Sequence, residues 1–163
     1  MSGVLIVYYS KTGNVQKMAR AVAEGVRELD VDVSLSKAED FRVDHLKDFA
    51  GIVIGSPTYY GTMAWQIKKI IDDSVRFHGE LEGKVGGAFT SSANLGGGNE
   101  TTILEIVHAM LVHGMIVQGT HSGDHYGPVA LGTPDERATK QCKALGRRVA
   151  RLVKATMDHN LAE

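Results

Sequence analysis

The sequence is poor in the residues that build disulfides, metal clusters and membrane spans. Its 163 residues include one cysteine, Cys142, which excludes an internal disulfide and a cysteine-only zinc or iron–sulfur site. No apolar run approaches the roughly 18–20 residues that span a bilayer, and the N-terminus has no secretory signal pattern. Because 18 Lys and Arg are balanced by 19 Asp and Glu, the net charge of −1 argues against nucleic-acid binding. We therefore expect a cytoplasmic protein with no membrane insertion and no nucleic-acid partner.

Proline is scarce, with 3 residues, whereas glycine is abundant, with 19. The glycine share is about 12%, against an average of about 7%. Most of these glycines stand beside Ser, Thr or Asn between apolar segments, where they predict ligand-binding turns. The length and the apolar content of 43% fit one compact domain over residues 1–163.

Apolar patterns of strand and helix type alternate along the chain. Short apolar runs predict strands at residues 4–8, 31–35, 51–55, 84–89 and 115–118. Periodic apolar positions predict helices over residues 15–29 and 63–75, from the loop at 90–99 to Gly114, and from 133 onward, with a short helix or turn at 40–48. With right-handed crossovers, such alternation predicts an α/β fold: a doubly wound five-stranded parallel sheet of order 2-1-3-4-5.

Local signals refine these boundaries. Pro57 lacks an amide and is expected to end the third strand. Thr133, Pro134 and Glu136 fit a capping box in which Thr133 is the N-cap of the last helix. The inner face of that helix is expected to carry Ala138, Cys142, Leu145, Val149, Leu152 and Met157.

The switch point of such a sheet, between strands 1 and 3, is where ligands bind. The loop that leaves strand 1 contains Ser10, Lys11, Thr12, Gly13 and Asn14 and leads into a helix. The free amides of a helix N-terminus suit a phosphate, the hydroxyls add donors, Gly13 permits close approach and Asn14 caps the helix. A polar turn with a helix cap is the alternative. The glycine patterns that bind ATP or a Rossmann-type dinucleotide are absent at this position.

Two further loops leave strands 3 and 4 at the same edge. The first carries Pro57, Thr58, Tyr59, Tyr60 and Gly61, whose tyrosine pair suits a flat apolar ring. The second offers backbone and hydroxyl groups to the polar edge of a heterocycle, and its candidate residues are Ser91, Ser92, Ala93, Asn94, Gly96 and Gly97. A phosphate cradle, an aromatic pair and a polar rim together predict a site for flavin mononucleotide (FMN).

Other conspicuous residues have simpler explanations. His121, Asp124 and His125 are more typical of a solvated loop than of a metal site, so no metal ligand is predicted. The three arginines between 147 and 151 could attract an anion, but a solvated helix face is the favoured interpretation. No side chain is predicted to act as a catalytic nucleophile or acid, because a flavin carries the redox chemistry itself.

The loop sequences resemble those of the flavodoxin-like FMN proteins, and most closely the tryptophan-repressor-binding protein (WrbA) family of NAD(P)H:quinone oxidoreductases. The matching segments are 7–14 with 18–25, 55–61, 96–102 and 113–115. The resemblance implies that Ser10 to Val15 hold the FMN phosphate, that Thr58 to Tyr60 flank the isoalloxazine and that Ser91 to Gly97 contact its polar edge. It also implies a flavin contact for His113, for which a favoured charge at a helix end is the alternative explanation.

The resemblance further implies an FMN-dependent oxidoreductase that passes electrons from NAD(P)H to a quinone or similar acceptor. The alternative is a flavodoxin-type FMN electron carrier, which serves a redox-protein partner and has no NAD(P)H:quinone activity of its own. Such carriers are generally strongly acidic, which the net charge of −1 does not match. The family also implies a homo-oligomer, a dimer or tetramer, although the segments after strands 2 and 5 that help to build its tetramer are short here.

Overall fold

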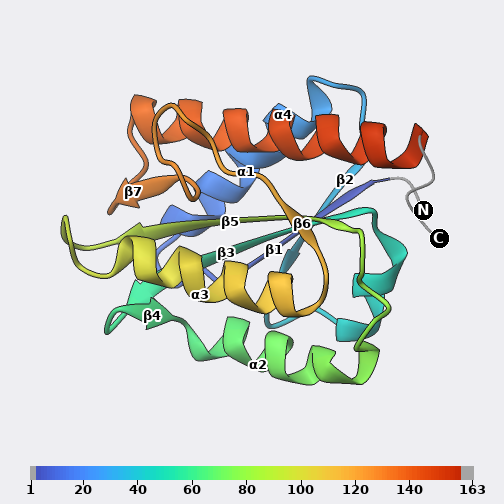
Figure 1. Ribbon diagram of the computed structural model, residues 1–163. Helices are drawn as coiled ribbons and strands as arrows, with labels where there is room; N and C mark the ends of the chain where they lie inside the picture. Colours follow the sequence, from blue (N-terminus) through green and yellow to red (C-terminus); the bar gives the residue numbers. More distant parts are fainter. Residues whose placement is uncertain (1–2, 159–163) are drawn as a thin grey trace.

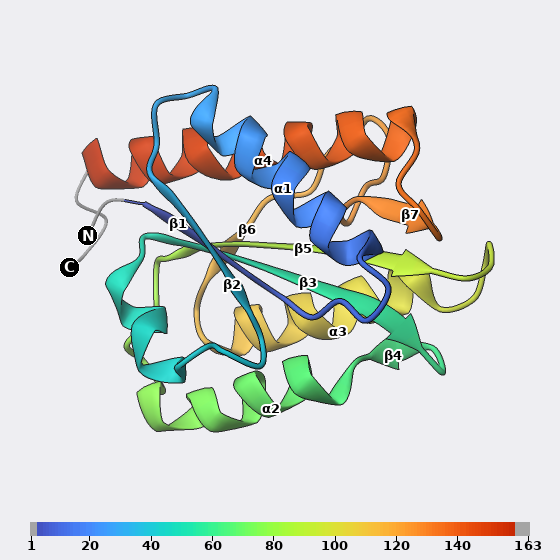
Figure 2. The ribbon, with the colours of Figure 1, turned by 180° about the vertical axis from the view of Figure 1, so that it is seen from behind.

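A parallel sheet between two pairs of helices forms the molecule (Figures 1 and 2). The computed structural model describes residues 3–158. The strands are β1 (Val4–Tyr8), β2 (Val33–Lys37), β3 (Gly51–Tyr59), β4 (Thr62–Met63), β5 (Val85–Ser92), β6 (Ile116–Val117) and β7 (Val129–Leu131). The helices are α1 (Asn14–Arg27), α2 (Trp65–Asp73), α3 (Asn99–Val112) and α4 (Glu136–Asp158), with two short 3-10 helices, η1 (Val43–Asp48) and η2 (Ser74–Phe77).

The main strands lie in the order β2-β1-β3-β5-β6, while β4 pairs with β3 and β7 with β5. Since β4 is a two-residue hairpin arm outside this path, the order confirms the predicted arrangement 2-1-3-4-5. Each successive pair along the path is parallel and in register, so the loops after β1, β3 and β5 leave the same edge of the sheet.

Two apolar cores hold the helices to the sheet. Alternate residues of β1 point to opposite faces, so Val4 and Ile6 enter the core beneath α1 and α4, while Leu5 and Val7 enter the core of α2 and α3. All five residues of β1 are buried, as expected for a continuous apolar strand covered on both faces. Because both faces of β1 are packed against helices, the end of β1 and the direction of the loop that follows it are fixed.

β3 continues two residues past Pro57, so the prediction that this proline ends the strand is wrong. Gly55 faces β1, because its carbonyl accepts the amide of Tyr9 at 3.1 Å. Pro57 faces the same side two residues later, where β1 has already ended at Tyr8. Its missing amide therefore costs no ladder hydrogen bond, and pairing with β5 continues as far as Ser91.

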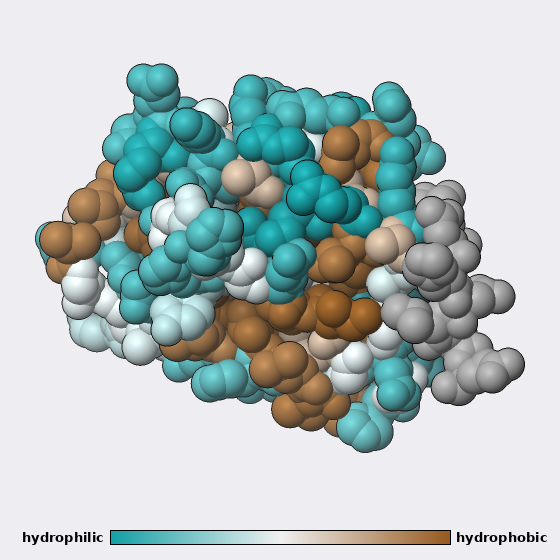
Figure 3. All heavy atoms as spheres, turned by 45° about the horizontal axis from the view of Figure 1, so that its top comes forward, coloured by the Kyte–Doolittle hydropathy of each residue, from teal (hydrophilic) through white to brown (hydrophobic). Residues whose placement is uncertain are grey.

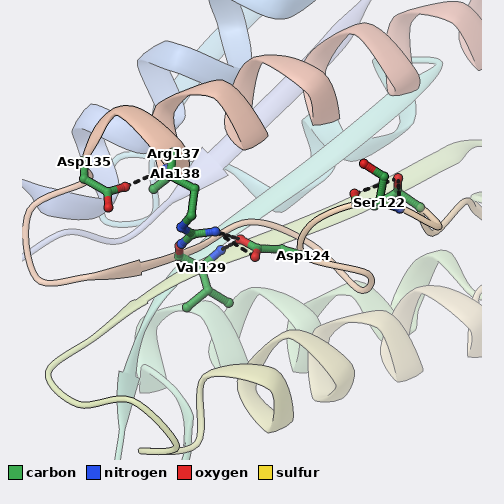
Figure 4. A network of polar contacts seen from close by, with 7 residues as sticks. Ser122, Asp124, Val129, Asp135, Arg137 and Ala138 are labelled. Carbon is green, nitrogen blue, oxygen red and sulfur yellow. Dashed lines mark hydrogen bonds and ion pairs between the residues drawn. The ribbon is translucent and has the colours of Figure 1, made fainter.

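Two short strands border β5 in place of the single one predicted over residues 115–118. β6 pairs with the start of β5, and β7, which was not predicted, pairs with its end from Thr90 to Ser92, three residues beyond the predicted end of that strand. The segment between β6 and β7 is fixed by Asp124. Its carboxylate accepts the Val129 amide at 2.8 Å and the Arg137 guanidinium at 2.8 and 2.9 Å (Figure 4).

α4 begins at Glu136 with Asp135 as its N-cap, instead of the predicted Thr133. The Asp135 carboxylate accepts the Ala138 amide at 2.7 Å (Figure 4). Asp135 can form this bond because it directly precedes the helix, and from there its short side chain reaches the third helical amide. The predicted inner face is buried as far as Val149, whereas Leu152 is half-buried and Met157 is 45% exposed. Within residues 3–158, no helix has both the length and the apolar content needed to cross a bilayer.

Candidate functional site

Three loops meet at the carboxyl edge of the sheet. They comprise residues 9–13 after β1, 60–61 after β3 and 93–98 after β5. The rings of Tyr9 and Tyr59 meet edge to face, with centroids 6.4 Å apart and planes at 76°. The turns after β1 and β3, on which the predicted site depends, therefore lie side by side.

The loop after β1 leaves backbone donors free at the start of α1. Gly13 is the N-cap residue, with a left-handed φ of 87° that favours glycine, and no side chain caps the helix. Within the described chain, no acceptor meets the amides of Gly13, Asn14 and Val15, while the amide of Gln16 donates to Ser10 Oγ at 3.2 Å. Three unpaired amides at the positive end of a helix dipole can bind an anion through neutral donors.

Two residues of this loop, Asn14 and Val15, have roles that differ from the predicted ones. Asn14 is the first helical residue and not the cap, and its Oδ1 accepts the Thr133 hydroxyl at 3.1 Å. Val15 is 2% exposed, with its side chain in the core, so only its amide can face a ligand. Lys11 and Thr12 are exposed, which leaves one ammonium and one hydroxyl free to supplement the amides.

Tyr60 and Gly61 form a two-residue hairpin turn between β3 and β4. Both residues have a positive φ, 49° and 80°, as type I′ hairpin turns require. A left-handed backbone is unfavourable for tyrosine, and the side chain of Tyr60 is fully exposed. Neither local conformation nor packing explains an aromatic residue here, which favours a role in binding.

The hairpin rests on the N-terminus of α3. A Cβ at Gly98 would lie 2.4 Å from the Cα of Gly61, so this close approach requires glycine. The Thr101 hydroxyl donates to the Gly61 carbonyl at 2.8 Å and fixes the turn. Tyr59 is 38% exposed, and burial of its ring edge and the neighbouring Tyr9 raise the pKa of its phenol, which stays neutral at physiological pH.

The loop after β5 divides into a supporting part and an exposed part. Ser91 Oγ donates to the Gly132 carbonyl at 2.7 Å, and Ser92 Oγ donates to the Asn94 carbonyl at 3.0 Å, so both buried hydroxyls are occupied within the chain. Residues 93–97 are exposed and include the predicted Ala93, Asn94, Gly96 and Gly97. Apart from the Asn94 carbonyl and the Gly97 amide, which bond each other within the loop, their backbone groups rather than the serine hydroxyls are available to a heterocycle.

His113 does not join these loops. α3 runs antiparallel to the strands, from Gly98 at the site to the amino end of β5, where Ile116 pairs with Val85. There His113 Nε2 forms a hydrogen bond of 2.8 Å with Ser74 Oγ. Within one chain, the predicted grouping of His113 with the loop residues is therefore wrong.

The donor set fits a phosphorylated flavin better than a nucleoside triphosphate. Free amides and hydroxyls can hold one phosphate, whereas a single exposed lysine, Lys11, gives little charge for a triphosphate. Tyr59 and Tyr60 offer aromatic faces beside that cradle, and the exposed backbone at 93–97 offers polar groups on the other side.

Sequence reasoning missed three contributors to this edge. Tyr9 packs against Tyr59, Gly98 supports the hairpin, and Thr133 ties the segment before α4 to Asn14. Tyr9 could have been found, because it directly follows a buried strand at the switch point. Gly98 and Thr133 gave no such signal, since their importance depends on contacts between segments distant in sequence.

Comparisons with known proteins agree with this site. The flavodoxin family model matches residues 6–105, which include all three loops. A protein of Archaeoglobus fulgidus named NAD(P)H dehydrogenase (quinone) is 35% identical, over 92% of this chain and 96% of that one. A flavodoxin of Aquifex aeolicus is 36% identical, over 97% and 90% of the two chains.

Among solved structures, a flavodoxin described as a WrbA-like protein from Agrobacterium tumefaciens superposes with a TM-score of 0.81 at 29% identity, over 95% of this chain and 99% of that one. These relatives confirm the predicted resemblance, and their names include both functions predicted from the sequence. The position of the family match and the 35–36% identity over nearly the whole chain establish that this protein belongs to the flavodoxin family.

Proposed function

We propose that the protein is an FMN-dependent oxidoreductase that passes electrons from NAD(P)H to a quinone or similar acceptor. One observation carries the proposal: unpaired amides at the N-terminus of α1 lie beside a hairpin that holds an exposed tyrosine in an unfavourable conformation. The first feature suits a phosphate and the second a flat ring, and the edge-to-face contact of Tyr9 with Tyr59 links them.

Residues 10–15 would hold the FMN phosphate. The amides of Gly13, Asn14 and Val15 point out of the helix end, and the hydroxyls of Ser10 and Thr12 flank them. Such neutral donors lose less solvation free energy on binding than buried ammonium groups would, and they bind a phosphate without a large local charge.

Residues 57–61 and 91–97 would position the flavin ring. Tyr59 and Tyr60 provide aromatic surface, Pro57 and Thr58 lie within the paired part of β3, and the exposed backbone at 93–97 can bond the polar edge of the ring. When bound, FMN supplies the two-electron chemistry that connects NAD(P)H with a quinone. The exposure of Tyr60 leaves an open face on which donor and acceptor can alternate.

The relatives named NAD(P)H dehydrogenase (quinone) support the enzyme, and the relatives named flavodoxin support the alternative of an electron carrier. One local feature also favours the carrier. Gly61 has a φ of 80° and open space around its missing Cβ, so the peptide that joins it to Tyr60 can reorient beside the ring, while Thr101 holds the carbonyl of Gly61 itself. The net charge of −1 argues against the carrier, because a carrier that docks on basic partners needs a strongly acidic surface.

The test is an absorbance measurement on the purified full-length protein. We expect a yellow protein, or one that becomes yellow with FMN, whose absorbance bleaches on anaerobic addition of NADH or NADPH and returns when a quinone is added. Bleaching with dithionite but not with either nicotinamide would favour the carrier. A protein that stays colourless with added FMN would overturn both.

The same proposal includes self-association into a dimer or tetramer in the cytoplasm. Several large apolar side chains on α2, α3 and η2 are exposed, among them Trp65 at 68%, Val75 at 69% and Val112 at 72%. Exposed apolar surface of this kind is available to a second copy. Analytical ultracentrifugation with and without FMN measures the oligomeric state.

A further inference from the structure

A polar groove lies on the helical face away from the three loops. It has a volume of about 330 Å³ and runs between α4 and the segment after β6, lined by Gln118, Gly119, Thr120, His121, Ala144, Arg147, Arg148 and Arg151. Figure 3 shows the surface over α4 as mostly hydrophilic, above an apolar band. We propose that this groove binds a small phosphate-bearing anion, at a site separate from the flavin site.

The three arginines hold many unused donors. A guanidinium has five N–H groups. Arg147 uses one nitrogen for Glu28, at 2.7 Å, and Arg148 uses Nε for the Gln118 carbonyl, at 3.0 Å. Within the described chain, Arg151 makes no hydrogen bond or ion pair, and both terminal nitrogens of Arg148 meet no acceptor. The planar forks of these side chains match the oxygen geometry of a phosphate.

Arg148 is the central residue of the groove. It is only partly exposed, and its hydrogen-bond partner is a neutral carbonyl instead of a carboxylate. Burial lowers the pKa of its guanidinium, which means that the surroundings disfavour its charge. A bound anion would compensate that charge, which the neutral Gln118 carbonyl does not neutralise.

Two other basic residues of the same helix are already neutralised. Arg137 pairs with Asp124 at 2.8 Å, and Lys143 pairs with Glu24 at 2.8 Å. Among the described residues, Glu28 is the carboxylate that pairs with an arginine of the groove, and that arginine is Arg147. The excess of positive charge is therefore local, although the whole chain has a net charge of −1.

The shape of the groove favours a small ligand over a polymer. A concave volume of about 330 Å³ falls at the lower end of ligand pockets, whereas nucleic acids and membranes bind extended basic surfaces. Arginine at all three positions favours phosphate over a monocarboxylate, because several forks can bond one tetrahedral group at once. Thr120 and His121 add polar side chains to the lining of the groove.

The experiment titrates the full-length protein by calorimetry with inorganic pyrophosphate, ribose 5-phosphate and, as a neutral control, ribose. The protein is first saturated with FMN and the unbound FMN is removed by gel filtration, so that the flavin loop is occupied where it binds FMN and no free phosphate-bearing flavin competes for the groove. Inorganic and organic phosphates are thereby compared as sources of the same group. We expect one site per chain for a phosphate compound, no heat from ribose, and affinity that falls with salt concentration.

Arg151→Gln is the principal variant, because this side chain is exposed and makes no hydrogen bond or ion pair with another described residue. We expect it to weaken the phosphate compound about tenfold, as for the loss of a charge-assisted hydrogen bond. Lys154→Gln is the matched control: it removes one exposed positive charge of α4 outside the groove and should change affinity less than about twofold. Arg151→Lys keeps the positive charge but removes the planar guanidinium, so we expect a loss of affinity between those of the other two variants.

Three results would overturn the proposal. Equal losses in the Arg151 and Lys154 variants would show general charge attraction, and loss of the heat in Thr12→Ala/Asn14→Ala would place the phosphate in the flavin loop. Binding of single-stranded DNA or anionic vesicles more tightly than of either phosphate compound would assign the arginines to a polymer or a lipid surface. The flavin proposal is tested by absorbance and stands or falls independently of these titrations.

Discussion

The two ends of the sheet use their polar groups in opposite ways. At the amino end, the buried Lys84 ammonium donates to the carbonyls of Lys47 and Phe49 at 3.0 and 2.7 Å, and the Ser74 hydroxyl donates to the Ile71 carbonyl at 2.6 Å. At the carboxyl end, the first amides of α1 meet no acceptor in the described chain, and Tyr60 is fully exposed.

The difference shows how one fold separates stability from binding. The amino end combines hydrogen-bonded polar groups with a small apolar cavity of about 30 Å³, lined by residues that include Leu81 and His113, and the buried Nδ1 of His113 is an exception without a partner. Free donors and an unfavourable turn remain at the other end, where a ligand can satisfy them. Substitutions at the amino end should therefore change the free energy of unfolding, and those at the carboxyl end should change flavin affinity.

Leu81→Ala is expected to have the largest effect. Leu81 is 2% exposed and lines the cavity at the amino end, so truncation removes apolar contacts and enlarges an existing void. We expect a loss of about 2–5 kcal/mol in the free energy of unfolding, measured by urea denaturation. The FMN dissociation constant of the folded fraction should not change. A large loss of FMN affinity at low urea would contradict the separation of the two ends.

Thr12→Ala combined with Asn14→Ala is expected to have the next largest effect, and on binding instead of stability. Removing two polar side chains beside the free amides should weaken FMN by about 2–3 kcal/mol, or roughly 30- to 150-fold, in a fluorescence-quenching titration. The unfolding free energy should change by less than about 1 kcal/mol.

Lys11→Gln is the matched control for that double variant. Because Lys11 is exposed, its charge should contribute no more than about 1 kcal/mol, or about fivefold, to FMN affinity. If Lys11→Gln weakened FMN more than the double variant, charge and not neutral donors would hold the phosphate.

Tyr60→Asn tests the unfavourable turn. Asparagine adopts a positive φ more readily than tyrosine, and the Tyr60 side chain is fully exposed. We therefore expect the variant to be more stable by about 0.5–1 kcal/mol and to bind FMN more weakly. Tyr60→Phe keeps the ring and should bind FMN like the original protein, so a stability gain without a loss of affinity in Tyr60→Asn would remove Tyr60 from the site.

The overall architecture could be predicted because it depends on long apolar patterns. The run at 4–8 and the periodic positions after Val15 specify β1 and α1, and right-handed crossovers then fix the strand order. β7 escaped prediction, because a three-residue strand is too short for a pattern and pairs with β5 only through the folded chain. The extension of β3 past Pro57 depends in the same way on where β1 ends.

The candidate site was predicted in outline but not in its details. Loops at the switch point follow from topology, whereas the roles of Ser91 and Ser92 depend on acceptors near the unpredicted β7 and in the loop itself. His113 could have been placed correctly from the sequence. A helix between two parallel strands runs back to the amino edge, so its last residue cannot lie beside the loop at its start.

His113 provides the smallest expected effect, as a pH dependence of stability confined to the amino end. The Ser74 hydroxyl hydrogen goes to Ile71, so His113 Nε2 donates to Ser74 and the buried Nδ1 is the nitrogen without a proton. Protonating Nδ1 would bury an unpaired charge. Burial first, and the nearby His78 second, accordingly lower the pKa of His113 below the ordinary 6.5.

The sign of the effect follows from proton uptake. As the pH falls below 6.5, His113 binds a proton in the unfolded chain before it does so in the native chain, because its native pKa is lower. The contribution of His113 to the free energy of unfolding is therefore complete above pH 6.5 and decreases as the pH drops toward the native pKa. Urea unfolding between pH 5 and 7.5 should therefore show a weaker pH dependence in His113→Gln than in the original protein, whose other six histidines are common to both. FMN affinity should respond equally to pH in the two proteins, because His113 lies at the opposite end of α3 from the flavin loops. Equal slopes of unfolding free energy would show that His113 titrates alike in the folded and unfolded chain, and a difference confined to FMN binding would return His113 to the flavin site.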